Sequence, residues 1–536
     1  MKSGKSKKMI VKGFSQGIDD IIEEFEIPNE FPKKVLEESQ KLMPPDDAEF
    51  SKRQDLRDEL IVTIDGETAK DFDDAVGISR MPEGGFRLKV SIADVSHYVL
   101  PGTTLDHEAY YRGNSAYFAD RCIPMLPEKL SNDLCSLVPH QPRLTLTADM
   151  VFNEKGIRVS ETFYPSVIKS VARLTYTEVS RVLVDRDESL RKKYANILST
   201  LEDMSALAHL LMKMRSTRGS IDFDLPESQI VFGAMSGGEE NATDDLEEVG
   251  IQNIVKAERN VAHRLIEEFM IAANEAVAEF ILFKNISSLY RIHNPPDNDR
   301  VKDFALLLHN LGYQYSLRKP SDPKTFAGVL PLVKGKPEER LVNTILLRTM
   351  NRAVYSASND GHFGLASECY THFTSPIRRY PDLVVHRALK QALGLIKVKQ
   401  AGPKTPKREK KNQKKRDEAM ERVAHHCSDT ERSAMKAEWA SRDLAACIFM
   451  RDKVGQEFSG IVSNLTKFGI FVEFDDFFLE GLVPLRLLTD DHYVFHEKAH
   501  VMTGRKTKKR IQVGNRVRVK VLNINLDKRW IDLVLI

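Results

Sequence analysis

The sequence predicts an α+β protein: a mixed domain of short strands and long helices, followed by a small C-terminal β-barrel. Short segments of alternating polar and apolar residues run from about residue 51 to 180, and segments with helical apolar spacing follow. Five more short strand-like segments occupy residues 453–536. At 536 residues the chain exceeds a single core, so we expect two to four domains.

The N-terminal segment, residues 1–50, is too short for a further complete β-barrel. Within it, the apolar run Met9–Val11 predicts a strand, and residues 32–42 predict a short helix that begins after Phe31. The basic start of the chain lacks the apolar segment of a signal peptide. We therefore expect the main domain to begin near residue 51.

Residues 51–180 carry the strand pattern. Alternation over residues 86–92, 145–152 and 166–174 predicts strands. Asp94 ends the first of these, and His97 follows in the turn. His97 fits a catalytic base or a hydrogen-bonded structural histidine, and the sequence favours the structural role.

Four aspartates lie within ten residues, between the apolar runs 60–62 and 75–76. Two carboxylates about 4 Å apart repel by roughly 4 kcal/mol at an effective dielectric near 20, so the group needs a compensating positive charge. A cluster without His or Cys suits a hard divalent cation, Mg²⁺ or Mn²⁺. The alternative, a solvated acidic turn, is disfavoured because apolar sequence flanks both sides. The four residues are Asp65, Asp71, Asp73 and Asp74.

Two long helices follow. Apolar residues from Ile197 to Met214 are spaced by three or four and predict a helix that Gly219 stops. A second such face runs from Leu265 to Ile281. Both stripes predict core packing, and residues 221–225 between them alternate in polarity.

Residues 397–416 are dense in Lys and Arg and contain Pro403 and Pro406. Like charges without apolar periodicity predict a disordered, solvated loop, and a sequence-independent contact with nucleic acid is the alternative. A helical stretch over residues 418–450 then closes the domain that we delimit as residues 51–452.

The last unit, residues 453–536, predicts an OB-type barrel. Phe468 and Phe471 flank a turn at Gly469. Phe471 suits core packing and exposure equally, whereas Phe468 beside Lys467 favours exposure. The predicted strands are residues 458–462, 469–474, 481–485, 516–521 and 530–534.

Composition excludes some classes. A net charge of +2 gives no global polybasic character, so any basic surface is local. Five cysteines form no CxxC pair, which indicates reduced thiols in a cytosol. His425, His426 and Cys427 lack the second ligand pair of a zinc finger. No apolar run reaches transmembrane length, so we expect a soluble, cytoplasmic protein without a membrane partner.

The aspartate cluster resembles the catalytic signature of the ribonuclease II/ribonuclease R family. Residues 92–99, 123–132 and 372–382 extend the resemblance in the family's order, over about 300 residues, and it covers nearly the whole chain from about Ile27. The C-terminal unit resembles an S1 domain, the family's usual C-terminal RNA binder. Cold-shock-type domains usually precede the family's core, and residues 1–50 contain no counterpart. We expect a naturally shortened protein or a truncated N-terminus.

The resemblance implies a metal-dependent 3′→5′ exoribonuclease that hydrolyses RNA processively to nucleoside 5′-monophosphates with little sequence preference. The implied partner is single-stranded RNA with a free 3′ end, and we expect a monomer. The four aspartates would hold Mg²⁺ or Mn²⁺, with Asp73 most closely tied to turnover. The guanidinium of Arg378 would steady the scissile phosphate. The alternative for Arg378 is an ion pair with a structural carboxylate such as Asp382.

The resemblance also implies base-stacking roles for Tyr117 and Phe223. The residues alone would place Tyr117 in the core, and they leave Phe223 equally suited to a core strand. Arg379 suits phosphate binding and structural pairing equally. Phe468 and Phe471 lie where an S1 domain places stacking aromatics.

Two functions compete with this one. The first is an RNA-binding or regulatory member of the same fold with weak catalysis, against which the complete aspartate set and Arg378 argue. The second is a ribonuclease II-like enzyme that stalls at duplexes, since the sequence does not reveal unwinding.

Overall fold

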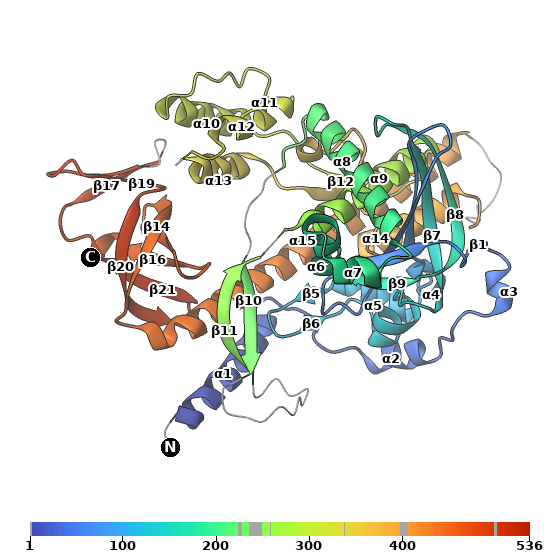
Figure 1. Cartoon of the computed structure of the whole chain (residues 1–536), viewed down its shortest axis with the longest axis horizontal. Coiled ribbons are helices and arrows are strands. Elements are labelled where there is room, and N and C mark those ends of the chain that lie inside the picture. The colour runs from blue at the N-terminus through green and yellow to red at the C-terminus, as the bar shows by residue number, and fades with distance from the viewer. Residues whose placement is uncertain are drawn as a thin grey trace.

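The computed structural model describes residues 3–222, 228–234, 249–257, 259–336, 338–396, 406–497 and 501–536. Figure 1 shows the C-terminal barrel at one end and the large strand-rich domain at the other. The predicted α+β class, with a mixed domain and a C-terminal barrel, is confirmed. No described helix is long and apolar enough to cross a membrane.

The large domain is built on a seven-stranded sheet of order β1-β8-β7-β4-β3-β2-β9. Pairs β1–β8 and β2–β9 are parallel, and the other neighbours are antiparallel. Only two residues separate β8 from β9, although these strands lie near opposite ends of the order, so the sheet is strongly curled. The strands are β1 (Gln54–Leu56), β2 (Ile61–Asp65), β3 (Asp74–Arg80), β4 (Phe86–Ala93), β7 (Pro142–Phe152), β8 (Arg158–Lys169) and β9 (Ala172–Thr175).

The strands predicted at 86–92 and 145–152 correspond to β4 and β7. The single strand predicted over residues 166–174 is wrong, because β8 ends at Lys169 and β9 begins at Ala172. Val171 between them donates its N–H to the Ile61 carbonyl at 2.9 Å. The chain thus passes from one edge of the curled sheet to the other, a change that local alternation does not record.

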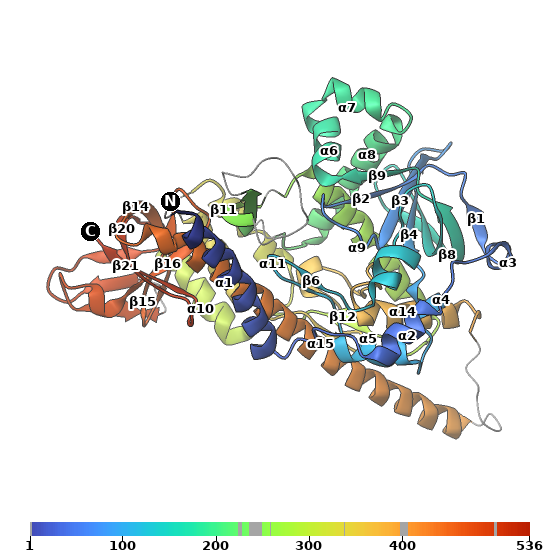
Figure 2. The same ribbon diagram turned by 90° about the horizontal axis from the view of Figure 1, so that it is seen from below.

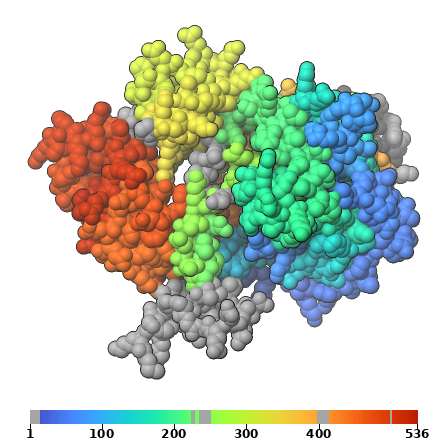
Figure 3. Space-filling model, in the orientation of Figure 1, coloured from blue at the N-terminus to red at the C-terminus, as the bar shows by residue number. Residues whose placement is uncertain are grey.

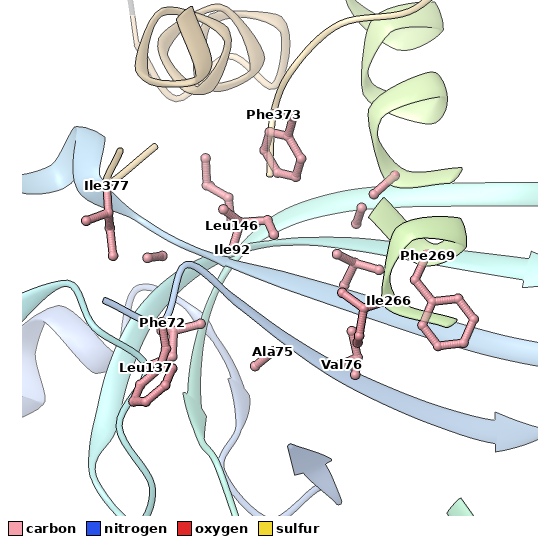
Figure 4. Close-up of a cluster of buried hydrophobic side chains, with 14 of the residues drawn as sticks. Phe72, Ala75, Val76, Ile92, Leu137, Leu146, Ile266, Phe269, Phe373 and Ile377 are labelled. Carbon is pink, nitrogen blue, oxygen red and sulfur yellow. The ribbon is translucent and has the colours of Figure 1, made fainter. Parts of the chain in front are cut away.

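The long helices α8 (Leu198–Arg218) and α9 (Val261–Phe283) confirm the helical prediction. Gly219 ends α8 with a φ of 102°, a left-handed conformation that favours glycine. Ile266 and Phe269 of α9 pack over the strands beside Val76 (Figure 4). This packing gives the sheet the buried face on which the site below depends.

Shorter helices complete the domain. The predicted helix near residues 32–42 is α2 (Lys33–Gln40). The others include α3 (Asp47–Phe50), α4 (Val95–Tyr98), α5 (Thr104–Arg112), α6 (Tyr176–Ser180), α7 (Glu188–Lys193) and α14 (Tyr380–Ala392), with two-stranded pairs β5 (Ala116–Tyr117)–β6 (Cys122–Ile123), β10 (Ser228–Ala234)–β11 (Val249–Lys256) and β12 (Tyr290–Ile292)–β13 (Val354–Ser356).

One 45-residue helix, α15 (Pro406–Met450), joins the large domain to the barrel (Figure 2). The loop predicted over residues 397–416 is therefore wrong from Pro406 onward, and residues 397–405 lie outside the described residues. Lys and Arg are good helix formers, and proline is tolerated in the first turn. A helix that packing already stabilises can extend by further turns at little free-energy cost. This accounts for the helical conformation of the basic residues at the start of α15.

A strand at Met9–Val11 is also wrong, because α1 (Ser3–Glu24) is helical throughout. Phe14, Ile18 and Ile21 recur at helical spacing, and all three are buried in an apolar cluster with α15. Packing of this amphipathic face outweighs the strand preference of one short apolar run.

Residues 298–349 form a helical unit beside the barrel (Figures 1 and 3). Arg340 makes two 2.6 Å hydrogen bonds to Glu473 of the barrel, and the apolar core of this unit is continuous with the barrel core. The helices are α10 (Asn298–Asn310), α11 (Lys324–Ala327), α12 (Leu330–Val333) and α13 (Glu339–Thr349).

The C-terminal barrel closes in the order β14-β15-β16-β21-β20, which confirms the five-stranded barrel predicted from the sequence. A three-stranded sheet, absent from the prediction, is inserted between β16 and β20. The barrel strands are β14 (Glu457–Thr466), β15 (Gly469–Phe474), β16 (Glu480–Pro484), β20 (Arg516–Asn525) and β21 (Trp530–Leu535), and the inserted strands are β17 (Tyr493–His496), β18 (Val501–Gly504) and β19 (Arg510–Gln512).

Candidate active site

A cavity of about 1400 Å³ opens where β2 ends and β3 begins. The separate parts of the chain that meet there include the β2–β3 loop, the β5–β6 hairpin, helix α9 and the segment before α14. Seven of the residues singled out in the sequence line this one cavity. They are Asp65, Asp71, Asp73, Asp74, Tyr117, Arg378 and Arg379.

The β2–β3 loop is fixed by contacts on both sides. The Phe72 ring is buried beneath the loop (Figure 4), and its N–H donates to Ser136 Oγ at 3.0 Å. Arg173 Nη2 donates to the carbonyl oxygens of Gly66 and Glu67 at 2.6 and 2.7 Å. Because these contacts hold the backbone between β2 and β3, the aspartate side chains that this segment carries point in fixed directions.

Asp73 is the most deeply buried of the four carboxylates. The Ile377 N–H donates to its Oδ1 at 2.8 Å. Its Oδ2 lies 3.3 Å from Arg378 Nε but lacks a hydrogen-bond partner of good geometry. Burial raises the pKa of Asp73 well above its ordinary value, despite the nearby guanidinium. This buried oxygen therefore requires more positive charge than Arg378 alone supplies.

Asp74 and Asp65 lie close enough to repel each other. Burial, together with the charge of Asp65, raises the pKa of Asp74 to about 7. Burial also raises the pKa of Asp65, although the Gly66 N–H donates to its Oδ1 at 2.7 Å. The site therefore holds more negative charge than its own arginines balance.

The donor set fits a divalent cation of the hard, oxygen-binding kind. Every candidate ligand is a carboxylate oxygen, and Asp73 Oδ2 is an orphaned buried acceptor. Within the described ranges, however, no three Asp, Glu, His or Cys side chains are gathered into a ready-made metal cluster. A bound cation would draw these carboxylate side chains together, because it offsets their mutual repulsion.

The segment before α14 settles how the two arginines are paired. Arg379 forms a bidentate pair with Asp382 at 2.8 and 2.9 Å, so its guanidinium serves the helix start. Arg378 instead faces Asp73, and its Nη2 donates to Ser375 Oγ at 3.0 Å. Its side chain remains 45% exposed toward the cavity, where an anionic ligand can reach it.

Tyr117 lies on β5 and is 40% exposed, so the core position suggested by the residues alone is wrong. Its hydroxyl lies 3.4 Å from Asp71 Oδ2, which places the ring beside the carboxylates. The bonded pairs Tyr117–Cys122 and Ala116–Ile123 form the short hairpin that carries it.

Several other residues line the cavity to which the sequence assigned no role. Tyr176 stacks on His263, with ring centroids 3.9 Å apart, and burial beside Asp65 and Asp74 raises its pKa. Tyr370 and His372 enter the cavity from the segment before α14. No spacing rule could have found Tyr176, since only the fold brings α6 to the end of β2.

The remaining predicted residues lie elsewhere. Phe468 is 67% exposed on the β14–β15 turn. Phe471 is half-buried and alternates with the inward-facing Ile470 and Val472, so it points away from the barrel core. Phe223 lies outside the described residues. His97 is held by Arg53 and Glu49 outside the cavity, which matches the structural role that the sequence favours.

Comparison with known proteins adds independent evidence. The RNB domain family model matches residues 53–394, and the S1 RNA binding domain model matches residues 451–535. Ribonuclease R of Aquifex aeolicus is 42% identical over 521 residues, covering 97% of this chain and 70% of that protein. Ribonuclease R of Escherichia coli is 40% identical over 526 residues, covering 98% of this chain and 62% of that protein.

A solved structure of Mycoplasma genitalium RNase R in complex with ribose methylated single-stranded RNA superposes with a TM-score of 0.85 at 30% identity. The match covers 98% of this chain and 78% of that one. Relative to the two curated relatives, this chain spans 62% to 70% of their length. The resemblance to the ribonuclease II/ribonuclease R family is confirmed: the chain belongs to the RNB-domain family of ribonucleases, as a relative of bacterial ribonuclease R.

Proposed function

We propose that this protein is a divalent-metal-dependent 3′→5′ exoribonuclease that releases nucleoside 5′-monophosphates. One observation carries the proposal: a set of under-compensated aspartates, an exposed arginine and a tyrosine line one cavity in a chain of the RNB family. Phosphodiester hydrolysis needs these elements together, because a water must be activated and charge on the phosphate must be balanced.

The proposed role of each carboxylate follows from its position in the cavity. Asp65 and Asp74, whose pKa values burial raises, would hold Mg²⁺ or Mn²⁺, and Asp71 would assist from the loop. Such an ion, when bound, supplies an activated water and neutralises charge on the phosphate. Asp73, which accepts a hydrogen bond from the Ile377 N–H, would orient the groups at the reacting phosphate. The rate of turnover would depend on this residue most strongly.

The cationic and aromatic groups would bind the RNA itself. Arg378 would donate to the scissile phosphate, since its fork of N–H groups matches phosphate oxygens. Arg379, already bonded to Asp382, would keep that segment in place and add positive charge to the wall. The Tyr117 ring would stack on the terminal base.

The barrel would grip the RNA outside the cavity. Phe468 and Phe471 offer exposed ring faces on one turn, and base stacking tolerates any sequence. We therefore assign residues 51–452 to catalysis and residues 453–536 to RNA binding. We expect a cytosolic monomer that takes single-stranded RNA with a free 3′ end, and all five cysteines are free thiols.

The direct test uses 5′-labelled single-stranded RNA, with and without Mg²⁺. We expect stepwise shortening from the 3′ end, release of nucleoside 5′-monophosphates, and loss of both in EDTA. Binding without cleavage at any Mg²⁺ or Mn²⁺ concentration would instead indicate an RNA-binding member of the fold. A duplex with a 3′ overhang, run in parallel, separates an enzyme that stalls at duplexes from one that continues.

A further inference from the structure

We propose that helix α1 positions the β5–β6 hairpin through Arg121, and thereby sets the shortest RNA that the enzyme retains. The inference rests on the proposed function, because the hairpin carries Tyr117 into the cavity. Residue Arg121 acts here as a positioning residue, since its charged head is bonded to α1 and its neighbour Asp120.

The polar link joins the tip of the hairpin to one face of α1. Arg121 Nη1 donates to Asp19 Oδ1 at 2.9 Å, and Arg121 Nη2 donates to Ser15 Oγ at 2.6 Å. Asp19 and Ser15 lie one helical turn apart, so they present two acceptors side by side to a single guanidinium. This geometry restrains both the position and the orientation of the tip.

An apolar link reinforces the polar one. Phe118, next to Tyr117, is buried in the cluster that contains Phe14 and Ile18 of α1. The same cluster contains Ala116 and Ile123, the residues that pair at the base of the hairpin. Removing α1 would therefore expose the apolar side chains of Ala116, Phe118 and Ile123 that the hairpin buries in this cluster.

On its other side the hairpin depends on α15. The Tyr117 N–H donates to Glu438 Oε1 at 3.1 Å, and the Ala119 N–H donates to Ser441 Oγ at 3.3 Å. The hairpin itself has only two paired positions on each strand. A two-stranded hairpin is marginally stable by itself, so its position must come from the helices that flank it.

Helix α1 packs closely against Leu444 of α15 at Gly17. A Cβ at Gly17 would lie 2.6 Å from Leu444 Cδ2, so a larger side chain must push the two helices apart or displace Leu444. Glu24 at the end of α1 also pairs with Arg529 of the barrel at 2.7 Å. The helix therefore contacts the barrel, α15 and the hairpin at once.

The consequence concerns short RNA in particular. A shift of the hairpin would weaken the stacking of Tyr117 on the terminal base, and Tyr117 Oη lies 3.4 Å from Asp71 Oδ2. A long RNA keeps many other contacts when Tyr117 shifts, whereas a short RNA loses a large share of its binding free energy. The structure thus assigns α1 a role in the length of the end product.

The test compares Asp19→Ala with Asp20→Ala, which removes the same charge from the adjacent, exposed position of α1. Each variant is made in the whole 536-residue chain, and its reaction with 5′-labelled RNA is run to completion. We expect Asp19→Ala to degrade long RNA at the parental rate but to stop at a longer product. Its KM for a five-nucleotide RNA should rise by up to about fivefold at unchanged kcat, the upper range for a partly exposed ion pair. Asp20→Ala should match the parent.

Two further variants sharpen the result. Asp19→Glu, which keeps a carboxylate one helical turn from Ser15, should keep the end product near parental length, and Gly17→Leu should lengthen it more than Asp19→Ala. Equal end products for Asp19→Ala, Asp20→Ala and the parent would overturn the inference. Binding of the short RNA in an Asp73→Asn background provides a readout that needs no turnover. If the parent itself shows no cleavage, the proposed function fails, and that binding comparison still decides the role of α1.

Discussion

The carboxylate cavity and the β14–β15 turn of the barrel differ in the exposure of their predicted functional side chains. Asp73 is buried and lacks a full set of partners, while Phe468 is 67% exposed and needs none. Desolvated charge is strongly coupled to its neighbours, so a single change in the cavity affects the whole site. An exposed ring contributes one stacking contact among several, so its loss is partial. The comparison predicts near-complete loss of cleavage when the buried carboxylate changes and graded effects when an exposed aromatic residue changes.

The largest effect is expected for Asp73→Asn. The amide keeps an acceptor for the Ile377 N–H but loses the charge beside Arg378, so cleavage should fall by at least about a thousandfold. RNA affinity should stay near parental, because phosphate and stacking contacts elsewhere supply most of it. Single-turnover rates and equilibrium binding measure the two separately. Asp58→Asn, at an exposed position before β2, is the control, and joint loss of binding and folding would mark Asp73 as structural.

The second effect concerns pH. The folded protein holds the Asp74 proton up to about pH 7, whereas the unfolded chain releases it near 3.8, so native protein binds more protons between these values. Metal-free protein should therefore lose stability as the pH rises through this window. Asp74→Asn should remove up to about 4 kcal/mol of that loss.

Urea unfolding in EDTA at about pH 4.5 and about pH 8 measures this difference. Added Mg²⁺ or Mn²⁺ should stabilise the parent at the higher pH more than it stabilises Asp74→Asn. Identical pH dependence for the two proteins would show that Asp74 does not carry the excess charge of the site.

A third prediction separates the role of Tyr117 from the role of the carboxylates in the cavity. Tyr117→Ala should still degrade long RNA but leave a longer end product, because one stacked base is worth about 1–3 kcal/mol, or a factor of about 5 to 150. Gel analysis of a 5′-labelled oligomer gives the end length. Tyr111→Ala, at an exposed tyrosine of α5 outside this cavity, should behave as the parent. Equal end lengths for all three proteins would exclude the stacking role.

The smallest effect is expected on the barrel. Phe468→Ala should weaken RNA binding by about fivefold to tenfold, and Phe468→Trp should restore it, because any aromatic face can stack. Fluorescence titration with single-stranded RNA measures both. Phe283→Ala, at an 83% exposed phenylalanine on α9, provides a matched control. A loss as large with Phe283→Ala would mean that no specific barrel surface is involved.

Deleting residues 453–536 should, by the same reasoning, weaken RNA binding but leave hydrolysis of short oligonucleotides measurable. The deletion also exposes Cys447 and Met450 of α15, which share a core with the barrel. Circular dichroism must therefore accompany it. A folded deletion variant that does not hydrolyse saturating short RNA would contradict this division of labour.

The sequence predicted the parts of the site that are local. All four aspartates lie between the end of β2 and the start of β3, within ten residues, so spacing alone brings them together. The bond between the Ile377 N–H and Asp73 joins residues 304 positions apart, and no pattern within either segment records it. The choice between Arg378 and Arg379 as partner of Asp382 likewise required the geometry of the α14 start.

The fold was predictable where periodicity and burial agree. Strand β4 and helix α9 each bury one regular face, so their patterns are clear. Prediction failed at α1, where a short apolar run belongs to a helical face that packs on α15. It failed again at the start of α15, where charge indicated a loop although the residues are good helix formers.

One measurement tests the central contrast most directly: single-turnover cleavage by Asp73→Asn and Phe468→Ala across rising RNA concentration, with Mg²⁺ present. If the cavity performs the chemistry and the barrel supplies grip, saturating RNA restores Phe468→Ala to the parental rate and leaves Asp73→Asn inactive. If saturating RNA restores Asp73→Asn, or fails to restore Phe468→Ala, the division between the two regions is contradicted.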